Sequence, residues 1–344
     1  MKTTIYNQID LQNTNVQHHI KDVIQSGGIV VFPTETVYGI GANALDKNAA
    51  KKVYEVKGRP SDNPLIVHIE KPEDLSRYVE VIPDDANGLI KAFWPGPLTI
   101  IFQKRDIIPT TITGGLNTVA IRCPSNPIAN AVIKFASTPL CAPSANISGK
   151  PSSTLFEHVV DDMMGKVDVI IDGGKSQIGL ESTVLDLTSE EPTILRPGFI
   201  TRQMIETVLN KSVLDKSVVT PTEVPKSPGM KYKHYAPSGV ITVLYGKEVD
   251  IINYINTQLS TNLNVKIGVI CSTELYDKIQ TSRKFDIGSM SNDAEVASNL
   301  FIALRKMDEL GVDIIYTHAF SELELGNATM NRLLKASSYN IKKV

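Results

Sequence analysis

The chain has 344 residues, which at roughly 150 residues per domain predicts two domains. Hydrophobic residues make up 42% and charged residues 21% of it, a globular composition that excludes a disordered or fibrous protein. The formal net charge of −2 argues against general attraction to nucleic acid or membranes, although a local basic site stays open.

The amino terminus shows no sign of a signal peptide or a membrane anchor. Residues 1–17 are polar, and apolar runs such as Ile29–Phe32 are far shorter than the ~20 residues that cross a bilayer. Cys123, Cys141 and Cys271 are widely spaced and include no CxxC pair, which disfavours a disulfide framework or a zinc cluster. We therefore expect a cytoplasmic protein.

Residues 1–210 alternate short apolar runs with amphipathic helical patterns, which predicts a mixed α/β domain with parallel and antiparallel strand pairs. The helix predicted over 48–57 has a clear stop signal, because Gly58 and Pro60 follow it. The turn at 189–192 predicts a hairpin. The expected strands are 29–32, 65–69, 98–102, 119–122, 140–142, 167–171, 183–187 and 193–196, and the expected helices are 48–57, 84–93, 127–135 and 154–164.

Regular patterning stops over residues 211–238, where Ser, Thr, Val, Pro and Lys mix without a period. This composition predicts an extended linker. So long an irregular segment is uncommon in a compact domain, so we expect it to be either flexible or functional. Residues 239–344 return to alternating strands and helices, which predicts a small Rossmann-like domain. Its expected strands are 240–245, 266–271 and 313–317, with helices up to about 259 and over 293–310.

Two groups of polar residues follow predicted elements of the first domain. Thr34 and Thr36 come directly after a buried strand, where they are either well placed for a ligand carboxylate or part of an ordinary loop. Lys57 and Arg59 end a helix, where they suit a polyanion, because the guanidinium fork binds phosphate oxygens in pairs. The alternative is that both cations only complement the negative end of the helix.

Further candidates stand at strand ends and in a loop of small residues. Arg122 and Arg196 each end a predicted strand, and Ser144 and Asn146 follow another. His68 lies in an apolar strand and by itself is more typical of a buried structural histidine. Together these donors and cations favour phosphoryl-type chemistry, in which the protein aligns reactants and neutralises charge. Neither a nucleophile elbow nor an HExxH pattern is found in the sequence.

Five motifs, in the same order along the chain, resemble the YrdC family. They are PTETVYG at 33–39, KGRP at 57–60 with NPL at 63–65, APSAN at 142–146, EST at 181–183 and RPG at 196–198. The linker sequence SPGMKYKHYAP at 227–237 is similar to that of the long, two-domain threonylcarbamoyl-AMP synthases. The resemblance implies a YrdC-like domain with a twisted mixed sheet over 1–210, a linker over 211–238 that folds over the active site, and a Rossmann-like parallel α/β domain over 239–344.

The resemblance implies a nucleotidyltransferase that converts L-threonine, bicarbonate and ATP into threonylcarbamoyl-AMP and pyrophosphate. The product would serve the threonylcarbamoyl modification of adenosine next to the anticodon of tRNAs. A downstream tRNA-modifying transferase complex would take the product, and a weak direct contact with tRNA remains open. Mg²⁺ would accompany ATP, held through its phosphates, because no dedicated metal site of side chains is evident.

The resemblance also assigns individual residues. L-threonine or its carbamate would be held by Thr36, His68, Arg122, Ala142 and Ser182. ATP would be surrounded by Arg59, Asn63, Thr118, Ser144, Ser152, Arg196 and Tyr235. The catalytic set would be Lys57, Arg59, Ser144 and Asn146, of which Lys57 and Asn146 would contact phosphates. Because a carbamate decomposes readily in water, a linker closed over the site would keep it dry.

Two other functions are weighed against this one. The first is a non-catalytic module that binds tRNA or double-stranded RNA through the lysines near residues 47–59, but the net charge and the scarcity of exposed aromatic motifs disfavour it. The second is a carbamoyl-transferring maturation enzyme, since YrdC-like domains also occur in such proteins. Those proteins carry further domains and metal-binding cysteine clusters, which this sequence lacks.

Overall fold

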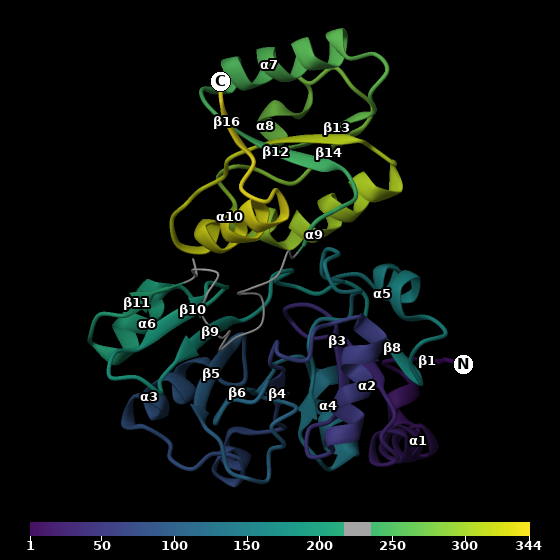
Figure 1. Cartoon of the computed structure of the whole chain (residues 1–344), viewed down its shortest axis with the longest axis vertical. Helices are drawn as coiled ribbons and strands as arrows, with labels where there is room; N and C mark the ends of the chain where they lie inside the picture. Colours follow the sequence, from purple (N-terminus) through teal and green to yellow (C-terminus); the bar gives the residue numbers. More distant parts are fainter. Residues whose placement is uncertain (217–234) are drawn as a thin grey trace. The chain divides into compact units, whose positions relative to one another are not determined.

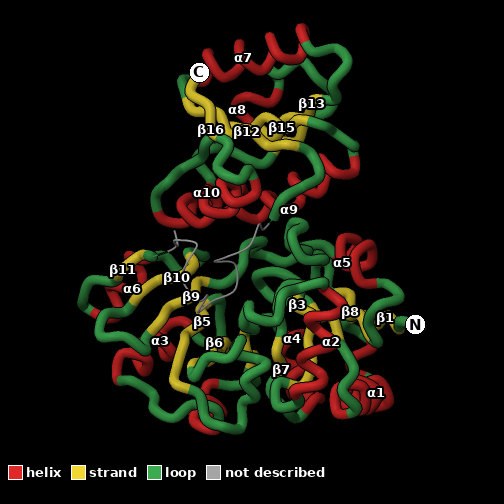
Figure 2. The backbone as a smooth tube through the Cα atoms, viewed as in Figure 1, coloured by secondary structure: helices red, strands yellow, loops and turns green. Residues whose placement is uncertain are grey.

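The computed structural model describes residues 1–216 and 235–344, which form two compact units. The first unit holds the described residues up to 216 apart from two short segments, Gly149–Pro151 and Ile178–Leu180. These segments and residues 235–344 make up the second unit (Figures 1 and 2). Of the linker predicted over 211–238, residues 217–234 lie outside the described part of the chain. No helix in the described ranges is long and apolar enough to span a membrane.

The described residues of the first unit form an 11-stranded mixed sheet with the strand order β1-β8-β2-β3-β7-β4-β6-β5-β9-β10-β11. This mixture of parallel and antiparallel pairs confirms the predicted fold class. The strands are β1 (Thr4–Asn7), β2 (Val30–Phe32), β3 (Gly39–Asn43), β4 (Ile66–His68), β5 (Leu98–Gln103), β6 (Thr118–Arg122), β7 (Leu140–Cys141), β8 (Val169–Asp172), β9 (Thr183–Asp186), β10 (Thr193–Arg196) and β11 (Leu214–Asp215). The helices are α1 (Thr14–Gln25), α2 (Lys47–Lys57), α3 (Asp84–Phe93), α4 (Pro127–Ala136), α5 (Phe156–Met163) and α6 (Arg202–Leu209), with short 3₁₀ turns η1 (Asp10–Gln12) and η2 (Pro72–Arg77).

Local signals account for the elements that the sequence predicted well. The side chain of Asp46 accepts a hydrogen bond from the Asn48 N–H at the start of α2, and Gly58 ends the helix with a φ of 61°. The hairpin predicted around 189–192 is confirmed by the antiparallel pair β9–β10. Strand β1 and helix α1 were not predicted, because the helix buries only a narrow apolar stripe that includes Ile20 and Ile24.

Helices cover one face of this sheet along the whole stretch between β8 and β10. Helices α2, α3, α5 and α6 pack apolar side chains there against alternate residues of the strands. The helical contributors include Val53, Leu89, Val159 and Ile205, each fully buried. This layer is the main hydrophobic core of the first unit.

The opposite face is covered by helices over only part of the sheet. Helices α1 and α4 pack on it near β8, β2 and β7, forming a second core. On the neighbouring strands the same face carries a small apolar cluster to which no described helix contributes. Its members are Ile66, Ile101, Ala120, Val184 and Leu195. On β4, β6, β5, β9 and β10, the side chains that point away from the main core are therefore not covered by a described helix, and a ligand can reach them.

A bulge in β10 decides which side chain this strand presents. Ile194 pairs with Leu185, but Arg196 pairs with Val184, so the register shifts between them. Ile194 belongs to the helix-covered core, whereas Val184 belongs to the small cluster on the other face. The extra residue thus turns Arg196 toward the face without helices.

The second unit contains a five-stranded sheet in which every strand pair is parallel. This confirms the predicted small parallel α/β domain. The order β14-β13-β15-β12-β16 differs from the usual Rossmann order, because β15 lies between β12 and β13. The elements are β12 (Val240–Tyr245), α7 (Glu248–Thr261), β13 (Ile267–Cys271), α8 (Thr273–Tyr276), β14 (Lys284–Asp286), α9 (Asp293–Glu309), β15 (Ile314–His318), α10 (Glu324–Ala336) and β16 (Ile341–Lys343).

Gly198 allows the chain after β10 to lie directly against the start of β9. A Cβ at this position would stand 2.8 Å from the Glu181 O and closer still to the Thr183 N. Because backbone atoms yield little, we expect Gly198→Ala to lower the free energy of unfolding by about 1–3 kcal/mol. Urea denaturation measures this change.

The matched control is Gly88→Ala on helix α3, where a Cβ would make ordinary contact at 3.4 Å with Val208. A helical Gly→Ala change of this kind leaves stability unchanged or raises it slightly. Equal stabilities of the two variants would contradict the close approach at Gly198.

Candidate active site

The register of the strands brings three of the predicted threonine-binding residues, His68, Arg122 and Ser182, to one end of the face without helices. His68 on β4 pairs with Arg122 on β6, and Arg122 pairs with Thr99 on β5. Ser182 directly precedes β9, which runs alongside the beginning of β5. Since cross-strand partners project from the same face, His68, Thr99 and Arg122 form one row of side chains.

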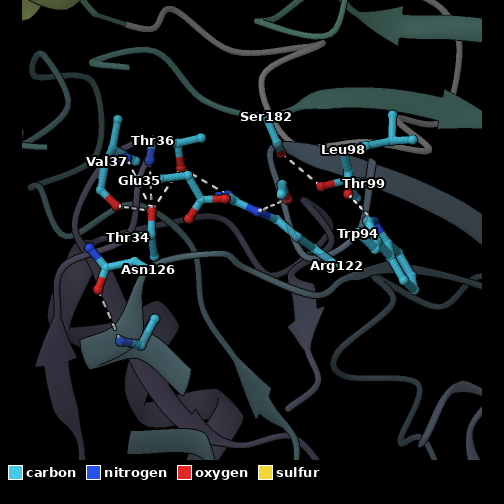
Figure 3. A network of polar contacts seen from close by, with 12 residues as sticks. Thr34, Glu35, Thr36, Val37, Trp94, Leu98, Thr99, Arg122, Asn126 and Ser182 are labelled. Carbon is cyan, nitrogen blue, oxygen red and sulfur yellow. Dashed lines mark hydrogen bonds and ion pairs between the residues drawn. The ribbon is translucent and has the colours of Figure 1, made fainter. Parts of the chain in front are cut away.

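Arg122 is the centre of a buried polar network (Figure 3). Its Nη2 lies 2.6 Å from Glu35 Oε1, its Nη1 donates to Thr36 Oγ1 at 2.8 Å, and its Nε donates to the Gly96 O at 3.3 Å. Burial by itself raises the pKa of Glu35, but the charge and hydrogen bond of Arg122 outweigh it and hold the pKa below its ordinary value. Glu35 is therefore an ionised partner that fixes the guanidinium.

Two threonine hydroxyls continue this network into the loop after β2. Thr34 Oγ1 donates to the Val37 O at 2.6 Å and lies 2.8 Å from Thr36 Oγ1. Because the single hydroxyl proton of Thr34 is already used, the proton between the two threonines belongs to Thr36. Thr36 Oγ1 thus accepts from Arg122, donates to Thr34, and keeps one lone pair for a ligand donor.

Ser182 joins residues that the resemblance assigns to different substrates. Arg196 Nη2 donates to Ser182 Oγ at 3.1 Å, and its Nε donates to the Ser182 O at 3.0 Å. Thr99 Oγ1 lies 2.7 Å from the same Ser182 hydroxyl. Arg196, predicted for ATP, therefore contacts the residue predicted for threonine.

His68 is a neutral ring at physiological pH. Burial, and next the positive charge of Arg122, lower the pKa of His68 to about 3. Its Nδ1 lies 3.3 Å from the Ile66 O. The imidazole can orient a ligand, but it carries no positive charge with which to attract one.

The loop after β7 extends toward the other end of the same face. Leu140 pairs with His68, and the Ala142 N–H donates to the Ile66 O at 2.9 Å, so the chain runs toward the beginning of β4. Within the loop, Ser144 Oγ donates to Asn146 Oδ1 at 2.6 Å. Ala142 is buried and contributes backbone and a small side chain rather than a polar group.

Lys57 braces this loop from the end of helix α2. Its side chain is buried, and its Nζ donates to the carbonyl oxygens of Ser144 and Asn146. The Lys57 carbonyl in turn accepts from the Ser148 N–H at 2.9 Å. These contacts shape the loop that carries Ser144 and Asn146, while the phosphate contact of Lys57 and Asn146 stays a prediction.

The end of the face opposite His68 and Arg122, called here the second end, holds Asn63, Arg59 and Thr118. Asn63 is buried just before β4, and its Oδ1 has no hydrogen-bond donor among the described residues. Arg59 Nε donates to the Asn63 O at 3.3 Å, which ties the arginine to this turn. Thr118 and Arg122 are the two ends of the five-residue β6, roughly 13 Å apart at the usual rise of a strand. Most of the residues predicted for ATP are thus separated along the sheet from those predicted for threonine.

Besides Arg196, two further predicted ATP residues lie apart from Asn63. Ser152 Oγ donates to Glu181 Oε1 at 2.6 Å and is buried next to the Ser182 segment. Tyr235 belongs to the second unit, where its ring stacks on Phe301 with centroids 5.2 Å apart. Its contact with ATP stays a prediction.

Sequence reasoning missed Glu35 and Thr99. A charged residue three positions after a fully apolar strand was the available signal for Glu35, because carboxylates are rarely buried without a partner. Thr99 had no signal of its own, because its role follows only from the strand register that places it opposite Arg122.

The oxygen atoms at the second end of the face are candidate ligands of a divalent cation. Within residues 1–216 and 235–344, no group of three or more His, Cys, Asp or Glu side chains is gathered for a metal, and all three cysteines are free and buried. The donors there are the amide and hydroxyl oxygens of Asn63, Ser144 and Asn146. This set fits a cation that enters with the phosphates of a nucleotide and keeps part of its water shell.

Comparison with known proteins identifies the family. The family model for Sua5, YciO and YrdC proteins, described as telomere recombination, matches residues 22–198. The chain belongs to the Sua5/YrdC family. A second model, described as the C-terminal domain of threonylcarbamoyl-AMP synthase, matches residues 200–338.

Relatives within the Sua5/YrdC family are similar over nearly the whole chain. A threonylcarbamoyl-AMP synthase of Pyrococcus abyssi is 48% identical over 93% of this chain and 94% of its own length. One of Bacillus subtilis is 43% identical over 92% and 91%, respectively. The crystal structure of P. abyssi Sua5 complexed with L-threonine has a TM-score of 0.93 and 44% identity, and covers 99% of this chain and 100% of that chain. These findings confirm the family indicated by the five motifs.

The burial of His68 predicts a specific pH dependence of stability. The unfolded chain protonates this ring near pH 6.5, whereas the folded chain does so only near pH 3. Because the unfolded state binds the extra proton between these values, stability is lost as the pH falls from 6.5 toward 3, by up to about 1.4 kcal/mol per pH unit. We expect His68→Gln to remove this component, which urea denaturation from pH 4 to 7 measures. Parallel stability curves of the variant and the wild type would contradict it.

Proposed function

We propose that the chain is a threonylcarbamoyl-AMP synthase, which converts L-threonine, bicarbonate and ATP into threonylcarbamoyl-AMP and pyrophosphate. The observation that carries the proposal is the buried Arg122 network, which offers a fixed cation and an oriented hydroxyl acceptor to a small zwitterion. Relatives at 43–48% identity over most of the chain bear this enzyme's name.

The reaction requires two steps. The neutral amino group of threonine attacks the carbon of bicarbonate, water leaves, and a carbamate forms. A carbamate oxygen then attacks the α-phosphorus of ATP while the bond to the β-phosphate breaks and pyrophosphate leaves. Side chains in such a reaction hold the reactants in line and neutralise charge, which suits a site of arginines, hydroxyls and amides.

The separation along β6 supports a division of labour within the site. Arg122, Thr36 and Ser182 would hold threonine and its carbamate, and Asn63 with Arg59 would hold the nucleotide. Arg196 contacts Ser182, so it would lie where the carbamate meets the α-phosphate. Mg²⁺ would arrive bound to ATP and neutralise its phosphates.

Three parts of the proposal lie beyond the site itself. The product would pass to a tRNA-modifying transferase complex, because a carbamoyl adenylate is an activated acyl donor that water destroys. The linker, whose residues 217–234 lie outside the described part of the chain, would close over the site. The reaction would take place in the cytoplasm, where ATP and tRNA are available.

The co-substrate requirement tests the reaction directly. We expect the purified chain to release pyrophosphate from ATP only when L-threonine and bicarbonate are both present, because the carbamate is the nucleophile. A coupled pyrophosphate assay with each component omitted in turn measures this. Pyrophosphate release that is indifferent to threonine would contradict the assigned substrate, and salt-sensitive tRNA binding without turnover would favour the RNA-binding alternative.

Arg59→Ala tests the nucleotide end of the site. Loss of a charge-assisted hydrogen bond to a phosphate costs about 2 kcal/mol, so we expect the KM for ATP to rise at least about tenfold. The KM for threonine should change little, because Arg59 is tied to the turn at Asn63 rather than to Arg122. Arg202→Ala, on the exposed side of α6, is the control. An unchanged KM for ATP would remove Arg59 from the nucleotide site.

A further inference from the structure

Glu35 is a buried carboxylate with no role in the substrate assignments above. Its side chain is 6% exposed and forms an ion pair with Arg122, whose side chain is 4% exposed. Burying a carboxylate is costly even when it is paired, so a glutamate at this position is maintained against an energetic penalty. A neutral amide of the same shape would leave the buried guanidinium of Arg122 without its counter-charge, so the charge of Glu35 is what this pair requires.

The guanidinium of Arg122 is oriented from three sides. Of its five N–H groups, one donates to the Gly96 O, one donates to Thr36 Oγ1, and one faces Glu35. Glu35 and Thr36 are neighbours in the sequence, so the same short loop holds both Nη atoms. Two N–H groups, one on each Nη, have no partner among these contacts of the described residues; they are held in direction by the other three and can donate to a ligand carboxylate.

The acceptor next to these donors is also fixed. Thr36 Oγ1, only 2.8 Å from Arg122 Nη1, donates its proton to Thr34 and keeps a lone pair. A carboxylate-binding cation beside a hydrogen-bond acceptor complements an α-amino acid, whose carboxylate and amino groups are separated by one carbon. Rotation of Arg122 would remove both features at once.

We propose that Glu35 is a positioning residue for L-threonine: it holds Arg122 in the orientation that presents its free N–H groups to the substrate carboxylate and keeps Thr36 Oγ1 as the acceptor for the substrate nitrogen. The inference rests on the proposed function and deepens it. Glu35 acts through Arg122 and Thr36. Its effect is confined to threonine, because Asn63 and Thr118 lie at the other end of the face.

Glu35→Gln in the full chain tests this role. We expect the KM for L-threonine to rise at least about tenfold, since one partner of a buried charge pair is lost, while the KM for ATP stays within about twofold. Glu35→Asp keeps the charge and should recover part of the threonine affinity. Glu55→Gln, the same chemical change at an exposed position of helix α2, is the matched control and should leave both constants unchanged.

Threonine binding measured by calorimetry, and the midpoint of thermal unfolding with and without threonine, provide readouts besides turnover. An unchanged threonine KM in Glu35→Gln overturns the inference. Equal losses for threonine and ATP that follow the fall in thermal stability also overturn it, because they indicate only a structural role. If Glu35→Gln does not fold, Glu35→Asp decides, since full wild-type threonine affinity in that variant would overturn the geometric requirement. Absence of threonine-dependent turnover in the wild type would instead reject the proposed function.

Discussion

This site depends on the alternation of side chains along β-strands, in a sheet whose two faces are covered by helices to different extents. Val119 and Ile121 enter the helix-covered core, so Thr118, Ala120 and Arg122 must face the other side. Where α1 and α4 cover that side it is a second core, and where no described helix covers it, polar residues share it with a small apolar cluster. A single alternation thus produces stability on one face and substrate chemistry on the other.

Elements with strong local signals could be predicted from the sequence. Helix α2 has a cap at Asp46 and a left-handed stop at Gly58, and α3 was expected at the bounds observed, Asp84–Phe93. The five motifs identified the family because each combines a turn with a functional side chain in a fixed order. The parallel sheet of the second unit followed from regular alternation of strands and helices, although nothing in the sequence indicates that β15 lies between β12 and β13.

The rest depends on contacts between distant residues. Arg122 is 86 positions from Thr36, and their hydrogen bond exists only because the sheet order brings the loop after β2 near the end of β6. Sequence reasoning placed the site beyond strand ends, as in a fully parallel sheet. In this mixed sheet the antiparallel β7 leads Ser144 and Asn146 away from His68, so the site spreads along a face. Lys57, predicted to touch phosphate, makes contacts that organise the loop instead of standing apart as a surface cation.

The bulge in β10 has a consequence for how this site tolerates change in chain length. Regular pairing after Ile194 would align Leu195, not Arg196, with Val184, and the arginine would then project among the apolar side chains of the main core. Closing the bulge without changing the number of residues would thus exchange a cation for an aliphatic group in the site, whereas deleting the extra residue would leave the arginine opposite Val184.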